Sequence, residues 1–504
     1  MQILMVTSES VPYAKTGGLA DVVFSLSKYL KKSGHDVRIV MPRYYGISTN
    51  DKELLPGHLG VPLSFGECWC GVYKDILPGT KEYGNDTNGG VGVPVYFLDN
   101  HELYGRDGVY GEFGGSYIDN CARFSCLSRG AFQLCKKLGW YPDIMHVHDW
   151  PTAIVPLILN SWEKDSYFTK TATVLTIHNL GYQGWFPKED IHYLQIPWEQ
   201  FYSSGLEFYD SLNFLKSGIL NADIITTVSP TYAKEIQTPE YGDMLDMPLR
   251  ERSYDLYGIL NGMDYDIWNP ETDSHIPSNF SSRDLSGKTE CKLQLQRSFG
   301  LEVNPDKPVI GIVSRFAQQK GFGALVGPGH GSLFSLCLNM DCQVVVLGTG
   351  DKWCEDQMQE LSYRLTNLSA RIAFDNSLAH LIEAGSDFFL MPSAYEPCGL
   401  NQMYSLRYAT LPIVRRTGGL ADTVWQYDQA TGEGTGFLFD TLSPDAIYNT
   451  VGWAVWAYYN KKDHIDMMRR RAMEVRFSWD KSGKEYEHLY KIAFEKRQRF
   501  RGLW

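Results

Sequence analysis

The sequence has few of the features that mark secreted, membrane or nucleic-acid-binding proteins. No apolar run among its 504 residues is long enough to cross a bilayer, and its apolar first residues have no basic flank of the kind that precedes a secretory signal. Basic residues (47) are fewer than acidic residues (59), which gives a formal charge of -12 and makes a phosphate backbone a poor partner. We therefore expect a cytoplasmic protein that binds neither membranes nor nucleic acid.

The common metal, disulfide and nucleotide motifs are also missing. The ten cysteines include no C-x-x-C pair. Only Cys68 and Cys70 are close together, in C-W-C, which predicts reduced thiols and neither a zinc site nor a disulfide framework. Neither the G-x-G-x-x-G fingerprint nor the Walker P-loop occurs, which disfavours a nicotinamide oxidoreductase. We expect no metal and no cofactor.

What the chain does contain is a repeated alternation of apolar runs and amphipathic stretches. Residues 2–9 are typical of a buried strand, residues 17–34 of a helix, and residues 37–43 of a second strand. This order is a βαβ unit, whose crossover requires a parallel sheet. The alternation restarts after residue 300, beyond a polar connection at about 269–306. We expect an α/β fold of two Rossmann-like, doubly wound domains facing a cleft, with ligands at the carboxyl ends of the strands. Further strands are expected at 93–99, 143–149, 171–179 and 223–229, and then at 308–315, 342–350, 370–375, 387–393 and 411–416.

One glycine-rich phrase occurs in both halves of the chain. The letters T-G-G-L-A-D begin at Thr16 and again at Thr417, and each copy precedes a helix-like segment. Glycines allow a ligand to approach the backbone closely, and a helix start offers N–H groups to an anion. The alternative is a tight turn without a ligand, so the glycine pair by itself is weak evidence for a binding site.

Charged residues lie beside the expected strand ends. Lys15 directly precedes the first glycine turn, and S-R-F-A-Q-Q-K-G places Arg315 and Lys320 after a strand of the second half. Glu396 follows another strand in Y-E-P-C-G-L. The cations are placed to neutralise phosphate, and the carboxylate is placed to bind sugar hydroxyls. The alternatives are solvated surface charge for the cations and a helix cap for Glu396.

Two segments resemble metal sites. His146 and His148 are two residues apart on an expected strand and therefore face the same side, and Asp264 and Asp266 form a D-x-D. His178 follows a later strand, but no complete ligand set accompanies it. We favour sugar-facing polar residues over a metal in both segments.

An ordered set of motifs identifies a family. K-T-G-G-L-A-D-V, H-V-H-D-W, T-I-H-N-L-G-Y-Q-G, L-N-G-M-D, S-R-F-A-Q-Q-K-G, E-P-C-G-L and R-R-T-G-G-L-A-D-T-V occur in this order over nearly the whole chain. The chain thereby resembles bacterial glycogen synthases and plant starch synthases. The resemblance implies the B-type glycosyltransferase architecture. It also implies transfer of glucose from ADP-glucose to the non-reducing end of an α-1,4-glucan, with retention of configuration. The two substrates are the expected partners, and the oligomeric state is left open.

The resemblance also implies a domain division and residue roles. An N-terminal domain on the acceptor glucan side would cover 1–264, an ADP-glucose-binding domain 265–477, and a helical segment at 478–504 would pack back on the first domain. Arg315 and Lys320 would neutralise the diphosphate in place of a metal ion. The implied catalytic residues are Glu396, His178, Asp149, Arg315 and Lys320. The implied substrate-binding residues are Lys15, Gly17, Gly18, Asp21, Trp150, Asn261, Phe374, Cys398, Gly399, Leu400, Thr417 and Gly418.

The sequence departs from the family at two places. Ala394 and Tyr395 replace an arginine and a phenylalanine before E-P-C-G-L. Residues 322–340, expected to form a crossover helix, contain four glycines and Pro328, which favours either a pair of compensating frameshifts or a shortened helix starting near Ser332. The second departure leaves a non-catalytic glucan-binding relative open. A metal-dependent hydrolase that uses His146 and His148 stays open as a function of another class.

Overall fold

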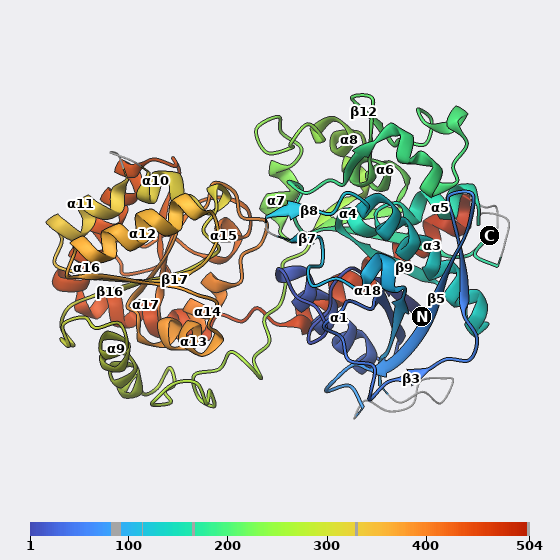
Figure 1. Cartoon of the computed structure of the whole chain (residues 1–504). Coiled ribbons are helices and arrows are strands. Elements are labelled where there is room, and N and C mark those ends of the chain that lie inside the picture. Colours follow the sequence, from blue (N-terminus) through green and yellow to red (C-terminus); the bar gives the residue numbers. More distant parts are fainter. Residues whose placement is uncertain (82–91, 113, 164–166, 328–330, 501–504) are drawn as a thin grey trace. The chain divides into compact units, whose positions relative to one another are not determined.

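The computed structural model describes residues 1–81, 92–112, 114–163, 167–327 and 331–500 (Figure 1). The chain forms two compact units. Unit 1 contains residues 1–228, 233–262 and 479–504, and unit 2 contains residues 229–232 and 263–478. Each unit has its own sheet and its own core. Within the described ranges, no helix has the length and apolar character that crossing a membrane requires.

Unit 1 is built on a parallel sheet whose winding reverses once. In spatial order its parallel strands are β6, β2, β1, β9, β10, β14 and β15. The chain therefore winds outward from β1 in one direction and then resumes at β9 on the other side of β1. Ligands bind at such reversal points in open α/β sheets, at the carboxyl ends of the strands. The bounds are β1 Gln2–Val6, β2 Asp36–Pro42, β6 Pro94–Asp99, β9 Ile144–His148, β10 Ala172–Ile177, β14 Ile224–Thr227 and β15 Leu256–Gly258.

An antiparallel hairpin extends one edge of this sheet. Strand β5 (Gly66–Ile76) pairs antiparallel with β6, with β3 (Glu53–Leu54) and with β4 (Leu59–Leu63). Helix α3 (Asn120–Leu138) belongs to the same unit, and almost every residue in its first four turns is buried. The sequence analysis did not predict this hairpin, because its residues lack a clear alternation of apolar and polar side chains.

The last helix of the chain completes the core of unit 1. Helix α18 (Trp479–Phe500), red in Figure 1, lies among the blue and teal elements of this unit. Tyr486 and Tyr490 belong to the same buried cluster as Ile3 and Met5 of β1. The hydroxyl group of Tyr490 also lies 2.8 Å from Nδ1 of His146 on β9. The core of unit 1 is thus assembled from both ends of the sequence.

Unit 2 has a parallel sheet with the strand order β18-β17-β16-β19-β20-β21. Numbered along the chain, this is the 3-2-1-4-5-6 order of a doubly wound Rossmann fold, with its reversal between β16 and β19. The predicted pair of Rossmann-like units is confirmed, although β18 begins two residues before the expected strand at 370–375. The bounds are β16 Val309–Val313, β17 Gln343–Gly348, β18 Leu368–Ile372, β19 Phe388–Met391, β20 Leu411–Arg415 and β21 Phe437–Phe439.

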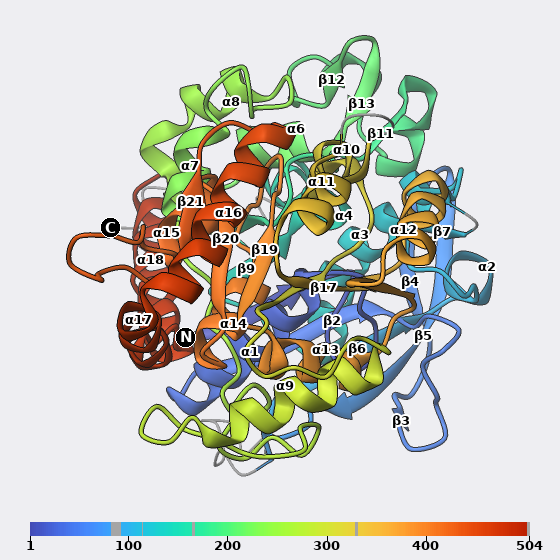
Figure 2. The ribbon, with the colours of Figure 1, turned by 90° about the vertical axis from the view of Figure 1, so that its left-hand side faces the viewer.

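Helices cover both faces of the unit 2 sheet (Figure 2). Ile310 and Val344 point to one face and pack with helices α10, α11 and α16. Val309 and Val345 point to the other face and pack with α9 and α13. Alternate residues of each strand are therefore buried on opposite faces, which explains the continuous apolar runs in the sequence. The helix bounds are α9 Ser286–Ser298, α10 Phe322–Val326, α11 Ser332–Asn339, α13 Asn376–Gly385 and α16 Pro444–Asn460.

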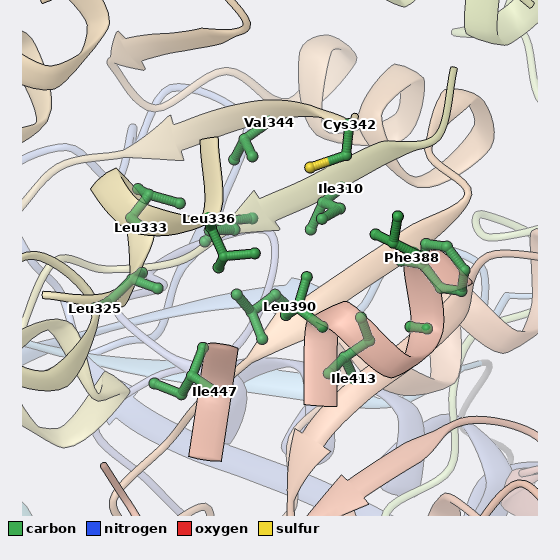
Figure 3. Packing of buried hydrophobic residues seen from close by; sticks show 14 of the residues in the cluster. Ile310, Leu325, Leu333, Leu336, Cys342, Val344, Phe388, Leu390, Ile413 and Ile447 are labelled. Atoms are coloured by element: carbon green, nitrogen blue, oxygen red, sulfur yellow. The ribbon is translucent and has the colours of Figure 1, made fainter. Parts of the chain in front are cut away.

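The glycine-rich crossover between β16 and β17 forms two short helices instead of one long helix. Helix α10 ends at Val326, and α11 begins at Ser332, the position expected for a shortened helix. Leu325, Leu333 and Leu336 lie in the unit 2 core beside Ile310 and Val344 (Figure 3). Pro328 and Gly329 lie outside the described residues. Apolar side chains of both short helices are therefore buried in the core, although no continuous helix forms.

Candidate active site

The first T-G-G-L-A-D copy begins helix α1 (Gly18–Lys32), which follows β1 at the reversal point of unit 1. Lys15 Nζ lies 2.9 Å from Asp21 Oδ1, and the Lys15 side chain is 48% exposed. Among the described residues, a Cβ added at Gly17 would meet no atom within 4 Å. The glycine turn is therefore open at Gly17. Lys15, which precedes the turn, forms an ion pair with Asp21 in the first turn of α1.

A buried carboxylate organises this turn, and the sequence analysis did not single it out. Glu9 is 2% exposed and accepts hydrogen bonds from the backbone N–H and the hydroxyl group of Thr16, the latter at 2.7 Å. The hydroxyl group of Tyr110 donates to Glu9 Oε1 at 2.5 Å. Glu9 lies in the T-S-E-S segment after β1, so its place at a strand end was the only available signal.

Three imidazoles lie in series on β9 and after β10, the two strands that follow the reversal of the unit 1 sheet. His148 Nδ1 is 3.1 Å from His178 Nε2, and His146 Nε2 is 2.6 Å from the Thr176 hydroxyl group. Burial lowers the pKa of His146 and of His178 to about 3, and it lowers the pKa of His148 as well. The three rings are therefore neutral at pH 7. His178, which is partly exposed, can exchange a hydrogen bond with a sugar hydroxyl without adding charge, whereas both ring nitrogens of the buried His146 already face the hydroxyl groups of Tyr490 and Thr176.

Asp149 connects β9 to β10 in unit 1. Its Oδ1 accepts hydrogen bonds from the backbone N–H groups of His178 (2.6 Å) and Asn179 (3.3 Å). Its φ of 52° lies in the left-handed region, which an aspartate adopts at a cost of roughly 1–3 kcal/mol. Burial raises its pKa to about 7, against the lowering effect of the two N–H groups. Asp149 thus fixes the position of His178 and can titrate near neutrality.

Trp150 and Asn261 are placed differently from each other. The Trp150 ring packs edge-on against Phe124, with centroids 4.9 Å apart, and a Cβ at Gly184 would come within 2.6 Å of it. The position of the Trp150 ring is therefore explained largely by its packing in unit 1. Asn261 is 5% exposed, and its Oδ1 has no hydrogen-bond partner among the described residues. An unpaired buried amide oxygen costs free energy, so Asn261 is a candidate for contacting a ligand.

The candidate residues of unit 2 meet at its own reversal point. Lys320 follows β16, Glu396 follows the neighbouring strand β19, and Lys320 Nζ lies 2.6 Å from Glu396 Oε2. The Ser393 hydroxyl group donates to the same oxygen at 2.9 Å. The carboxylate is 94% buried, whereas the lysine is 23% exposed. The structure therefore joins two residues to which the sequence analysis gave separate roles.

Arg315 and Phe374 are exposed side chains that follow the carboxyl ends of β16 and β18 in the unit 2 sheet. Arg315 Nη2 lies 3.4 Å from Gln319 Oε1, and the Phe374 ring, after β18, is 92% exposed. Ala394, one of the departures from the family, is held by its backbone. Its N–H donates to Gln319 O at 2.8 Å, and its carbonyl oxygen accepts from Arg415. The loop therefore stays hydrogen-bonded to Gln319 and Arg415, although the arginine that is common in the family is absent at this position.

The second T-G-G-L-A-D copy packs against the E-P-C-G segment. Gly419 N–H donates to the carbonyl oxygens of Glu396 (3.0 Å) and Pro397 (3.2 Å). A Cβ at Gly418 would collide with the Glu396 oxygen, and Gly418 has a φ of 44°. Thr417 is fully buried. The two copies thus differ, since the second copy uses its glycines to support the Glu396 loop.

The predicted metal alternatives are not supported. Of the residues that the structure describes, the one group of histidines, cysteines or acids arranged to hold a metal contains three cysteines, and neither His146 nor His148 belongs to it. Asp264 Oδ1 accepts from the Asp266 N–H at 2.8 Å, which is a local turn. Cys126, from a distant part of the chain, joins Cys68 and Cys70 in this group, which the spacing of C-W-C alone did not predict. The cysteines are free, as predicted.

Two doubly wound units with polar residues at both reversal points are the arrangement expected of a two-domain glycosyltransferase. Residues 2–251 match the family model described as "Starch synthase catalytic domain", and residues 296–461 match "Glycosyl transferases group 1". The chain is 51% identical over 498 residues to a glycogen synthase of Treponema denticola, covering 99% of each chain. It is 48% identical over 502 residues to glycogen synthase 1 of Geobacter sulfurreducens, covering 99% of this chain and 97% of that one. The chain belongs to the glycogen synthase and starch synthase family, and its activity is that of a glycogen synthase, a glucosyltransferase.

A solved structure has the same fold over nearly the whole length. The catalytic domain of Starch Synthase IV from Arabidopsis thaliana, bound to ADP and acarbose, has a TM-score of 0.87 and 30% identity, with 98% of this chain and 99% of that chain covered. A sucrose-phosphate synthase from Thermosynechococcus elongatus, at 16% identity and a TM-score of 0.59, shares the fold. The family resemblance expected from the ordered motifs is confirmed.

Proposed function

We propose that the chain transfers glucose from ADP-glucose to the non-reducing end of an α-1,4-glucan, with retention of configuration. The observation that carries this proposal is the Lys320–Glu396 pair at the reversal point of unit 2. A sugar nucleotide brings an anionic diphosphate and a neutral sugar into one site. A partly exposed lysine beside a buried carboxylate offers one group for each of them. The ADP in the Arabidopsis relative supports an adenine nucleotide as the leaving group.

The residues would act mainly through charge. Breaking the bond between the anomeric carbon and the diphosphate leaves positive charge on the sugar and negative charge on ADP. Lys320 and Arg315 would stabilise the diphosphate without a metal ion, and fixed donors of this kind lower a barrier without reorganising during the reaction. Glu396 would bind the donor glucose and orient Lys320. The backbone of Cys398, Gly399 and Leu400, supported by the second glycine turn, would complete the donor contacts.

Unit 1 would supply the remaining contacts. Lys15 and the turn at Gly17 and Gly18 would approach the phosphates, with Asp21 holding the lysine. His178, positioned by Asp149, would donate or accept one hydrogen bond at a glucose hydroxyl. Asn261 gains the partner that its buried amide oxygen lacks if a ligand hydroxyl reaches it. Phe374 of unit 2 would stack on adenine, which is consistent with its exposed ring.

One assay tests the proposal. Purified protein is incubated with glycogen and either ADP-glucose or UDP-glucose, and both nucleoside diphosphate release and glucose incorporation are measured. We expect incorporation with ADP-glucose at a kcat/KM well above that with UDP-glucose, and an α-1,4-linked product. Binding of both substrates without incorporation would instead identify a non-catalytic glucan-binding relative. A preference for UDP-glucose would overturn the proposed donor.

A further inference from the structure

Three cysteine thiols converge between β5 and α3 of unit 1, and none of them is among the residues proposed for glucosyl transfer. Cys68 and Cys70 are two residues apart on β5 and therefore face the same side of the strand. Cys126 reaches them from helix α3. The Cys126 sulfur lies 3.8 Å from the Cys70 sulfur and 3.8 Å from the Cys68 sulfur, and all three sulfurs lie within 4.8 Å of one another.

The sulfur spacing is the one that a shared metal ion requires. Zinc binds thiolate sulfur at about 2.3 Å, so two sulfurs on one tetrahedral ion are roughly 3.8 Å apart. A disulfide needs an S–S distance of about 2.05 Å, much shorter than the separations here. Hydrogen bonds between thiols would also allow this spacing, but a thiol is only a weak donor and a weak acceptor. The arrangement is therefore suited to an ion without backbone movement.

We propose that Cys68, Cys70 and Cys126 together bind one thiophilic metal ion, Zn²⁺ or Cu⁺. Three thiolates select soft or borderline ions over Mg²⁺ and Ca²⁺, which prefer oxygen ligands. Each thiol gives its proton to solvent as its sulfur–metal bond forms, so no oxidant or reductant takes part. Cys70 and Cys126 are buried, whereas Cys68 is partly exposed, which gives the ion a route of entry and leaves one tetrahedral position for water.

A neighbouring amide is oriented toward the proposed site. Asn100 Nδ2 donates to the Cys68 sulfur at 3.2 Å and to the Trp69 carbonyl oxygen at 3.2 Å. Its Oδ1 is already used, because it accepts from the Leu103 N–H at 3.0 Å and caps helix α2 (His101–Tyr104). The donor end of the amide therefore faces the sulfur, and hydrogen bonds of this kind stabilise and orient metal ligands.

The consequence would be a cross-link between two elements that are distant in sequence. Strand β5 pairs with β6 at the edge of the sheet, and α3 packs against β4, the strand that pairs with β5 on the other side. An ion bound to both elements would stabilise the hairpin against local opening, because binding to the folded form alone adds to its stability. The role is structural and independent of glucosyl transfer.

The test compares metal binding by the reduced full-length chain and by matched variants. The metal-free protein is titrated with Zn²⁺ or with Cu⁺ against a coloured chelator, and with Co²⁺ as a spectroscopic probe of thiolate ligation. We expect the wild type to bind one more ion per chain than Cys68→Ser does, and one more than Cys126→Ser does. The cobalt-loaded wild type should show a thiolate-to-cobalt absorption band that both variants lack. The two titrations show which of the two ions the site prefers. Cys135→Ser, on the same helix but outside the group, should behave as the wild type does.

Two controls keep the outcome clear. Cys68→Ser changes a partly exposed side chain, so its fold is expected to be kept even if Cys126→Ser unfolds. Glucosyl transfer by Cys68→Ser should equal that of the wild type, which shows that the variant is folded. Equal stoichiometry and equal cobalt spectra in the wild type and Cys68→Ser would overturn the proposal. So would a difference that Cys135→Ser reproduces.

Discussion

At the scale of single residues, the ion pair in unit 2 makes two roles depend on each other. Glu396→Ala removes both the proposed sugar contact and the carboxylate that lies 2.6 Å from Lys320 Nζ. A charge-assisted hydrogen bond contributes roughly 1.5–3 kcal/mol, so we expect kcat/KM to fall about 10- to 150-fold or more. The measurement is steady-state kinetics with ADP-glucose, together with a melting curve to show that the protein remains folded.

A matched control and a double mutant separate this role from a general loss of charge. Glu433→Ala removes an exposed carboxylate of the same unit and should leave turnover unchanged. Because Lys320 and Glu396 are in contact, Lys320→Ala and Glu396→Ala should be strongly non-additive when combined. Near-normal turnover in Glu396→Ala would contradict the assignment, and so would additive effects.

Asp149 gives a pH-dependent prediction. Its pKa is raised to about 7 by burial, so the folded state holds this proton more tightly than the unfolded chain does. The wild type therefore loses stability as the pH rises from the unfolded pKa, about 4, to about 7, and this loss is complete above that value. Asp149→Asn has no such titration. We expect the Asn variant to gain stability relative to the wild type between pH 4 and pH 7.

Urea unfolding of both proteins at pH 5 and pH 8 measures this effect. The buried histidines titrate in both proteins, so their contribution cancels in the difference between the two. A stability difference that is the same at the two pH values would show that the Asp149 carboxyl has an ordinary pKa in the folded protein.

The sequence predicted which loops carry polar residues but not how those residues pair. Lys320 and Glu396 were recognised from their places after strands, yet their contact depends on β16 and β19 being neighbours, which the strand order decides. Glu9 was missed because a buried carboxylate that binds backbone N–H groups leaves no spacing pattern. The supporting role of Gly418 was missed for a similar reason, since it depends on a loop of distant sequence.

At the scale of elements, the helices of the crossover between β16 and β17 are too short to protect their own amide hydrogens well against exchange with solvent. Helices α10 and α11 have five and eight residues, so each contains few internal hydrogen bonds. Their stability therefore depends on burial of Leu325, Leu333 and Leu336. We expect their amide hydrogens to exchange with solvent faster than those of α16, the longer helix that packs beside α11.

Hydrogen exchange measured by mass spectrometry checks this prediction, with peptides from α16 as the internal reference. Protection of α10 and α11 equal to that of α16 would contradict it. Resequencing the gene separately tests the frameshift hypothesis, which stays a prediction. A reading frame identical to the present sequence would favour a natural, interrupted helix.

Elements were predicted best where periodicity was strong. Helix α1 follows the expected spacing, with Leu19, Val23, Leu26 and Leu30 buried, and it ends before Gly34, whose φ of 89° suits glycine. The crossover shows the limit of this approach. Glycine and proline predicted an interrupted helix, but the burial that holds its two parts in place comes from the sheet, which local sequence does not encode.

At the scale of the whole molecule, the proposed chemistry is independent of metal ions. EDTA should leave glucosyl transfer nearly unchanged, whether or not the three cysteines hold an ion. Lys320→Ala should lower kcat roughly 100- to 1,000-fold, the effect typical of removing a fixed electrostatic stabiliser. Loss of activity with EDTA that Mg²⁺ restores would contradict the proposal. Rates measured with and without chelator in the wild type provide the comparison.

The return of helix α18 to unit 1 has a consequence for the order in which the protein is made. Residues 263–478, which form nearly all of unit 2, are translated between the body of unit 1 and its last helix. At about 5–20 residues per second, a ribosome takes roughly 10–40 s to synthesise this stretch. During that time the surface of β1 and β9 that later receives Tyr486 and Tyr490 is uncovered. The nascent unit 1 therefore exposes, while unit 2 is being made, an apolar surface of the kind that favours aggregation and that the finished protein buries.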